Sequence, residues 1–150
     1  MKIEWYGNRV FTAATAANIQ AMHKAVILVA NDVKTHFTLQ GSGRLYRRGH
    51  RASRPGEPPA IDTGTLRSSI MTTVEIEPTA VVGKIGPDVE FIGRELAKRG
   101  RAGAATLQAG VEYGCYLEVG TARMAPRPFL RPALARTKHK VEKIFKQANG

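Results

Sequence analysis

The sequence is short of cysteine, acidic residues and long apolar runs, and each shortage excludes a class of protein. Cys115 is the only cysteine among 150 residues, which excludes an intrachain disulfide framework and a thiolate metal cluster. No segment approaches the roughly 18 consecutive apolar residues of a membrane span. The first residues also lack the apolar run of a signal peptide. We therefore expect a soluble protein made in a reducing cytoplasm, with no membrane partner.

The shortage of acidic residues leaves a large positive charge. Lysine and arginine number 23 against 12 aspartates and glutamates, a formal net charge of +11. Such an excess favours a polyanion or an acidic protein as partner, but attraction to phosphates is independent of base sequence. Hydrophobic residues make up 43% of the chain, which suits one globular domain over residues 1–150.

The longest periodic segment runs from Thr12 to about Leu39. Its apolar residues recur at steps of three and four, which predicts one apolar stripe along a helix. The stripe consists of Ile19, Met22, Val26, Val29, Val33 and Phe37. We predict that Thr12 or Thr15 caps this helix and that Gly41 with Gly43 ends it. Residues 1–6 alternate as a short strand would.

Two segments with a period of two occupy the middle of the chain. Residues 70–77 alternate apolar and polar side chains, and residues 80–85 are rich in valine and isoleucine before Gly86 and Pro87. Pro78 and Thr79 between them suit a turn. An antiparallel hairpin is therefore predicted.

Two further helices are predicted near the end of the chain. Residues 110–119 form the first, which would bury Tyr113, Tyr116 and Leu117 and end at Gly120. The second runs from Arg131 to about Ala148, with Pro132 in its first turn. Its buried stripe is expected at Leu134, Val141, Ile144 and Phe145. Together the elements predict an α+β fold, in which a small antiparallel sheet packs against the long N-terminal helix and the C-terminal helix.

Two segments interrupt this pattern. Residues 41–60 are rich in glycine and proline and nearly free of apolar side chains, as expected of a flexible basic loop. Its arginines are Arg44, Arg47, Arg48, Arg51 and Arg54. They suit contact with DNA phosphates or with an acidic neighbour, and a purely solvated loop is the alternative. Residues 93–109, rich in alanine and glycine, resemble a mobile insert.

Signals for catalysis or cofactor binding are weak. Asp62-Thr63-Gly64 matches the triplet of aspartic proteases, in which two carboxylates share one proton, so a single triplet would require a dimer. The simpler interpretation is that Asp62 or Thr63 caps a short turn through Leu66. The histidines lack metal-ligand spacing, and Cys115 is expected to be a small buried residue. We predict no catalytic residue, no metal and no cofactor.

Two blocks carry a resemblance to a known family. They are PGEPPAIDTGTLRSSI at residues 55–70 and YGCYLEVGTARMAPRPFLRPAL at residues 113–134. In order and spacing they resemble the tail-completion or neck proteins of long-tailed bacteriophages, the HK97-type tail-component family. The matching residues of the first block are Pro55, Pro58, Asp62, Thr63, Gly64, Leu66, Arg67, Ser69 and Ile70. Those of the second are Tyr113, Tyr116, Glu118, Gly120, Thr121, Pro128, Phe129, Leu130, Pro132 and Ala133.

The resemblance implies a structural virion protein and no catalysis. Its copies would form a homo-oligomeric ring, a hexamer, at the head-tail junction, through which genomic DNA passes. Its neighbours would be head-connector or head-closure proteins on one side and tail-terminator or tail-tube proteins on the other. Gly114-Cys115 departs from the family, whose members often carry a small alanine there. Two alternatives remain open, a non-viral basic nucleic-acid-binding module and the dimeric aspartic protease.

Overall fold

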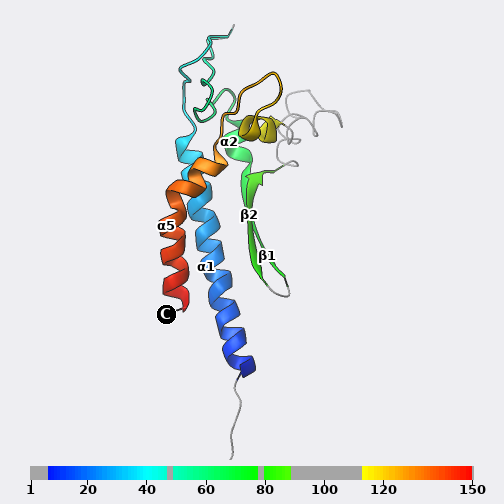
Figure 1. The fold of residues 1–150 in the computed structure, drawn as a ribbon, viewed down its shortest axis with the longest axis vertical. Helices are drawn as coiled ribbons and strands as arrows, with labels where there is room; N and C mark the ends of the chain where they lie inside the picture. Colours follow the sequence, from blue (N-terminus) through cyan, green and yellow to red (C-terminus); the bar gives the residue numbers. More distant parts are fainter. Residues whose placement is uncertain (1–6, 47–48, 78–79, 89–112, 150) are drawn as a thin grey trace, which may run out of the picture.

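The computed structural model describes residues 7–46, 49–77, 80–88 and 113–149, and the side chains of the first helix from Thr15 onward. The chain forms an α+β fold, as predicted. Its elements are α1 Gly7–His36, α2 Thr65–Ser69, β1 Ile70–Ile76, β2 Val81–Pro87, a helix over residues 113–119, and α5 Leu130–Asn149. Figure 1 shows α1 in the middle, with α5 along one side and the hairpin along the other.

The long helix α1 is confirmed, but both of its predicted ends are wrong. It begins at Gly7, so Thr12 and Thr15 lie inside it and cannot cap it. The alanines that surround these threonines are strong helix formers and carry the helix through them. It ends at His36, five residues before Gly41, because Phe37 turns into the core and Thr38 pairs with Ala60.

The hairpin is confirmed, and it lays one face on α1. Ile70 pairs with Pro87 and Ile76 with Val81 across an antiparallel ladder. Glycine is required at position 83, because a Cβ there would lie 2.5 Å from the Val26 side chain. The hairpin can therefore approach α1 closely only because Gly83 lacks a side chain.

The core lies where α1, the hairpin, the helix over residues 113–119 and the start of α5 meet. Its buried members are Val29, Ala30, Val33, Phe37, Ile70, Leu117, Phe129 and Ala133. The rings of Phe37 and Phe129 pack at 5.5 Å between centroids, a tilted arrangement. Phe129 is thus a core residue, and it ties the end of α1 to the start of α5.

Helix α5 begins one residue earlier than predicted, with Pro132 in its first turn as expected. One part of its predicted stripe is wrong, because Leu134 is 53% exposed. Ala133 and Thr137 are buried instead, and their small side chains let α5 lie close to α1. The Thr137 hydroxyl donates to the Ala133 carbonyl at 2.7 Å, so its burial leaves no unpaired donor.

Some predictions fall outside the described residues. These are the strand at residues 1–6, the turn at 78–79, the insert at 93–109, the start of the helix at 110–112, and Arg47 with Arg48. Across the part of the chain that the structure does describe, every helix is too short or too polar to cross a bilayer.

Candidate functional site at the base of the basic arm

Residues 41–60, here called the basic arm, fold back on themselves through backbone hydrogen bonds. The Gly41 N–H donates to Arg51 O at 3.0 Å, and the Gly43 N–H donates to Ala52 O at 2.7 Å. Farther out, the Ala52 N–H donates to Arg44 O at 3.0 Å. The arm projects from the end of the molecule where α1 stops (Figure 1). Its base is therefore held together by backbone hydrogen bonds and the isolated bridge between Leu45 and Arg51, where the sequence predicts only a flexible loop.

Gly41 and Gly43 serve this pairing rather than the end of α1. A Cβ built on Gly41 would lie 2.2 Å from the carbonyl carbon of Ala52, and one on Gly43 would lie 2.8 Å from Ala52 O. Both obstacles are backbone atoms, which cannot rotate away. The two glycines are therefore required for the two sides of the arm to approach each other.

We expect Gly41→Ala to open the base of the arm and to lower the free energy of unfolding by about 1–3 kcal/mol, the usual cost of overpacking. The measurement is limited trypsin digestion, in which cleavage after Arg44 and Arg51 should accelerate several-fold. Gly86→Ala is the matched control, because a Cβ at Gly86 meets no atom within 4 Å. Equal digestion rates for the two variants would contradict this role of Gly41.

The arm presents its charge to solvent. Arg44, Arg51 and Arg54 are all exposed. The Arg44 guanidinium lies 5.8 Å from the centroid of the Tyr46 ring, a cation–π contact. Arg51 donates to Gly43 O at 3.1 Å, which leaves most of its guanidinium available. Three of the five predicted contact arginines are therefore accessible to a partner.

Glu57 fastens the arm at its inner end. Its carboxylate accepts hydrogen bonds from the Ser42 hydroxyl and, at 2.8 Å, from the Arg54 N–H. These bonds, chiefly the one from Ser42, hold the pKa of Glu57 below its ordinary value. A lowered pKa means that this contact stabilises the arm near neutral pH and is lost as the pH falls through the acid range.

A cleft of about 1020 Å³ opens between the arm and the helix over residues 113–119. Its polar and aromatic walls are Arg44, Tyr46, His50, Asp62, Tyr113 and Arg127. The rings of Tyr46 and His50 stack at 6.4 Å between centroids. Partial burial raises the pKa of Tyr113, and the nearby Arg127 offsets part of that rise. The cleft is lined by two guanidinium groups, those of Arg44 and Arg127, and by one carboxylate, that of Asp62. This balance of charge suits an acidic occupant.

The DTG triplet lies at the mouth of this cleft. Gly64 occupies the N-cap position of α2 with φ 75°, so the prediction that Asp62 or Thr63 fills that position is wrong. The Thr63 hydroxyl accepts a long bond from the Thr65 N–H, at 3.4 Å, and lies 2.9 Å from the Thr65 hydroxyl. The Asp62 side chain is 69% exposed and lies 3.9 Å from His50. A triplet that leads into a helix, with an exposed carboxyl, does not favour the protease hypothesis.

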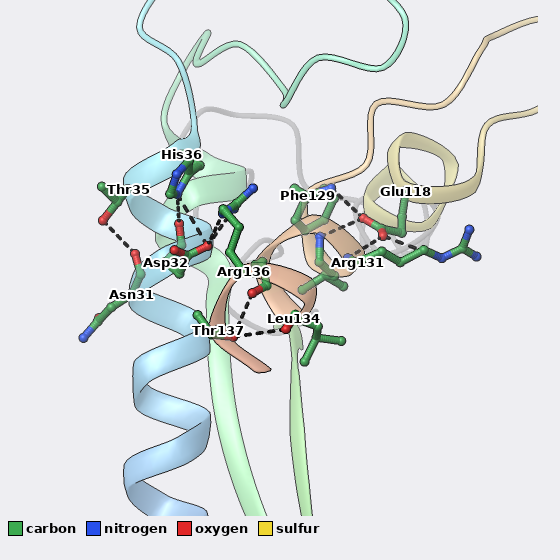
Figure 2. Close-up of polar contacts among 12 residues, drawn as sticks. Asn31, Asp32, Thr35, His36, Glu118, Phe129, Arg131, Leu134, Arg136 and Thr137 are labelled. Carbon is green, nitrogen blue, oxygen red and sulfur yellow. Dashed lines mark hydrogen bonds and ion pairs between the residues drawn. The ribbon is translucent and has the colours of Figure 1, made fainter. Parts of the chain in front are cut away.

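Glu118 holds the start of α5. Its carboxylate is buried and accepts three backbone N–H bonds, from Phe129 at 2.8 Å, Leu130 at 2.9 Å and Arg131 at 2.9 Å (Figure 2). These are free donors at a helix N-terminus, where a negative charge also complements the helix dipole. Glu118 is thus a capping residue supplied from another helix.

The two blocks of the resemblance pack into one unit. The Gly56 N–H donates to Pro126 O at 2.9 Å, and the Arg127 guanidinium donates to Ser53 O at 3.0 Å. The Arg127 N–H in turn donates to Leu117 O at 2.6 Å. The base of the arm is therefore tied to the segment that links the two last helices.

The helix over residues 113–119 ends as predicted but exposes more than predicted. Gly120 has φ 79°, and its N–H donates to Tyr116 O at 2.8 Å, the expected C-terminal arrangement. Leu117 is buried, whereas Tyr113 is 53% and Tyr116 42% exposed, so their predicted burial is wrong. Cys115 is also exposed, contrary to prediction. The predicted stripe assigned the aromatic residues to the core, but they lie on the faces that turn toward the cleft and solvent.

Gly114 packs closely against the hairpin. A Cβ at this position would lie 2.7 Å from the Pro87 ring, so an alanine would press on the end of β2. Thr121 is placed in the turn that follows this helix, where its N–H donates to Met124 O at 2.8 Å. Both residues therefore shape the connection between the hairpin, the helix and the linker.

Sequence reasoning missed two parts of this site. The sequence does hold a signal for the capping role of Glu118, since this acidic residue stands ten positions before the Pro-Phe-Leu-Arg-Pro segment at the start of α5. The separation of the two along the chain hid that signal. His50 and Tyr113 gave no signal that they would line one cleft with Tyr46. Within the described residues, no three histidine, cysteine or acidic side chains gather as a metal site would need. Comparison with family models, curated proteins and solved structures finds no match to this chain.

Proposed function

We propose that this chain is a structural protein of a long-tailed bacteriophage virion, whose copies form a ring at the head-tail junction. The observation that carries the proposal is that both blocks resembling the neck family meet in space. They share the Gly56–Pro126 hydrogen bond, and Ile70 of the first block lies in one core cluster with Leu117, Phe129 and Ala133 of the second. Glu118 fixes the helix that follows. If a family pattern specifies a fold, its residues are expected to meet in space even where they are far apart in the sequence.

The basic arm supplies a means of joining copies or neighbours. It carries exposed Leu45 and Tyr46 beside Arg44, and protein interfaces are enriched in aromatic residues and arginine. The adjacent cleft offers a recess for a partner's acidic segment. A ring closes when such a contact between unlike surfaces repeats with the right rotation. The head-connector or head-closure protein and the tail-terminator or tail-tube protein are the proposed neighbours, and genomic DNA the proposed content of the channel.

Omission of this protein during assembly tests the proposed place. Particles made without it should accumulate as DNA-filled heads and separate tails, because the junction lacks a component. Addition of the purified protein to such an extract should restore joined particles. Electron microscopy of the extract counts both forms. Joined particles at the normal yield in its absence would overturn the proposal.

Deletion of Gly43 to Arg54 tests the arm within that account. We expect the yield of DNA-retaining particles to fall at least tenfold, because the contact surface is removed. The triple substitution Arg44→Gln, Arg51→Gln and Arg54→Gln keeps the backbone pairing of the arm and serves as the matched variant. An unchanged yield for both would make the arm a solvated surface only.

A further inference from the structure

Helix α5 is strongly basic, a feature separate from the arm. It holds six lysines and arginines against one acidic residue, Glu142. The basic residues are Arg131, Arg136, Lys138, Lys140, Lys143 and Lys146. This is an unusual balance for a surface helix, since pairs of opposite charge normally alternate along such a face.

The two arginines and the four lysines differ in their partners. Arg136 donates two hydrogen bonds to Asp32, at 2.9 and 2.6 Å, and so joins α5 to α1 (Figure 2). Arg131 lies 3.9 Å from Glu118. Lys138, Lys140, Lys143 and Lys146 are all exposed, and no ion pair within the described residues involves them. We call these four the lysine face of α5.

The lysine face points away from the core. The buried residues of α5 are Ala133 and Thr137, with Val141 partly buried one turn later, and the helix turns this stripe toward α1. At 1.5 Å per residue, Lys138 to Lys146 spans about 12 Å along the helix. α5 lies at an outer edge of the described fold (Figure 1). On a helix of 3.6 residues per turn, Lys143 and Lys146 lie on the side away from this stripe, and Lys138 and Lys140 lie on opposite flanks. A partner can therefore contact Lys143 and Lys146 together with Lys138.

The composition of the face favours phosphates over protein. Lysine is depleted in the centres of protein interfaces, where aromatic residues and arginine are enriched. From Lys138 to Lys146 the only aromatic residue besides His139 is Phe145, which is partly buried. Duplex DNA carries one charge per roughly 1.7 Å of axis, which flexible lysines such as Lys138, Lys143 and Lys146 can meet without a fixed register. The arm, with Arg44 and Tyr46, has the opposite composition.

We infer that the lysine face of α5 binds the phosphate backbone of duplex nucleic acid without reading its sequence. Each ammonium group replaces a condensed counterion at a phosphate, and release of those counterions drives binding. The basic arm is then available to contact protein neighbours. The inference deepens the proposed function by naming the surface that would face the DNA channel, but duplex binding itself does not depend on a place in the virion.

The test is binding of the full chain to a mixed-sequence duplex of about 30 base pairs over a salt series. The variant is Lys138→Gln, Lys143→Gln and Lys146→Gln. Each lost phosphate contact should reduce the slope of log affinity against log salt by about 0.9, so the three together should reduce it by roughly 2–3. Affinity at low salt should fall at least tenfold, equally for unrelated duplexes.

Two matched variants of equal charge complete the experiment. Lys24→Gln, Lys84→Gln and Arg123→Gln remove three exposed charges from other elements and should leave the slope nearly unchanged. The arm variant Arg44→Gln, Arg51→Gln and Arg54→Gln should do the same. An α5 variant with the wild-type slope, a loss confined to the arm variant, or no duplex binding by the wild type would each overturn the inference. Circular dichroism of each variant checks that it is folded. The omission experiment on particles reports on the neck separately, so the two failures are distinguishable.

Discussion

Glu118→Ala is expected to lower the free energy of unfolding by about 3 kcal/mol, more than the ~1 kcal/mol of an ordinary exposed helix cap. The reason is that one buried carboxylate accepts N–H bonds from Phe129, Leu130 and Arg131, and alanine leaves all three donors without it. Unfolding in urea, monitored by circular dichroism, measures this loss of unfolding free energy. The start of α5 should also exchange its amide hydrogens faster.

The control for this variant lies on α5 itself. Glu142 is exposed and accepts no hydrogen bond from the helix start, so Glu142→Ala should change the free energy of unfolding by less than about 0.5 kcal/mol. The loss of unfolding free energy for Glu118→Gln should fall between those for Glu118→Ala and Glu142→Ala. The glutamine amide keeps one acceptor but turns a donor toward the N–H groups. A Glu118→Ala variant as stable as Glu142→Ala would contradict the capping role.

Phe129→Ala is expected to cost about 3–5 kcal/mol, the range for removal of a large buried aromatic side chain. Phe129 is 3% exposed and packs its ring on Phe37 at the point where α1, α5 and the hairpin converge. Loss of the ring leaves a cavity between the two long helices. Such a cost is a large fraction of the stability of a small domain, so the variant should be largely unfolded at 37 °C.

Leu134→Ala is the matched control for the aromatic variant. Both residues lie near the start of α5, but Leu134 is 53% exposed and its loss opens no cavity. We expect its cost to stay under about 1 kcal/mol. The sequence pattern predicts that Leu134 is buried. An equal loss of unfolding free energy in the two variants would support that prediction and contradict the exposed position of Leu134 in the structure. Thermal unfolding of both proteins under one condition decides the point.

The sequence predicts the long elements well because their periodicity reflects burial directly. The stripe of Val26, Val29 and Val33 is buried as its period predicts. The alternation after Ile70 predicts the strand, but burial fades along it: Ile70 is buried, Thr72 and Val74 are partly buried, and Ile76 is 64% exposed. The ends of elements are less predictable. Thr12 is a good cap in isolation, but the alanines around it continue the helix past it.

The candidate site is only partly predictable, because its contacts join residues distant in sequence. The positions of Phe129 and Gly120 follow from local rules. By contrast, the approach of Gly41 to Ala52, and of Glu118 to the start of α5, depends on how the arm and linker fold back. Tyr113 and Tyr116 have helical spacing with Leu117, but the helix buries Gly114, Leu117 and Glu118 instead, a stripe rotated by one residue toward Glu118.

The central claim is that copies of this chain form a ring at the head-tail junction. Electron cryomicroscopy of assembled particles, with symmetry determined from the images, tests it most directly. The account predicts a ring of density between head and tail that fits α1, α5 and the hairpin, with the lysine face of α5 toward the DNA. Density for this chain in the capsid shell or tail tip, or its absence from particles altogether, would contradict the claim.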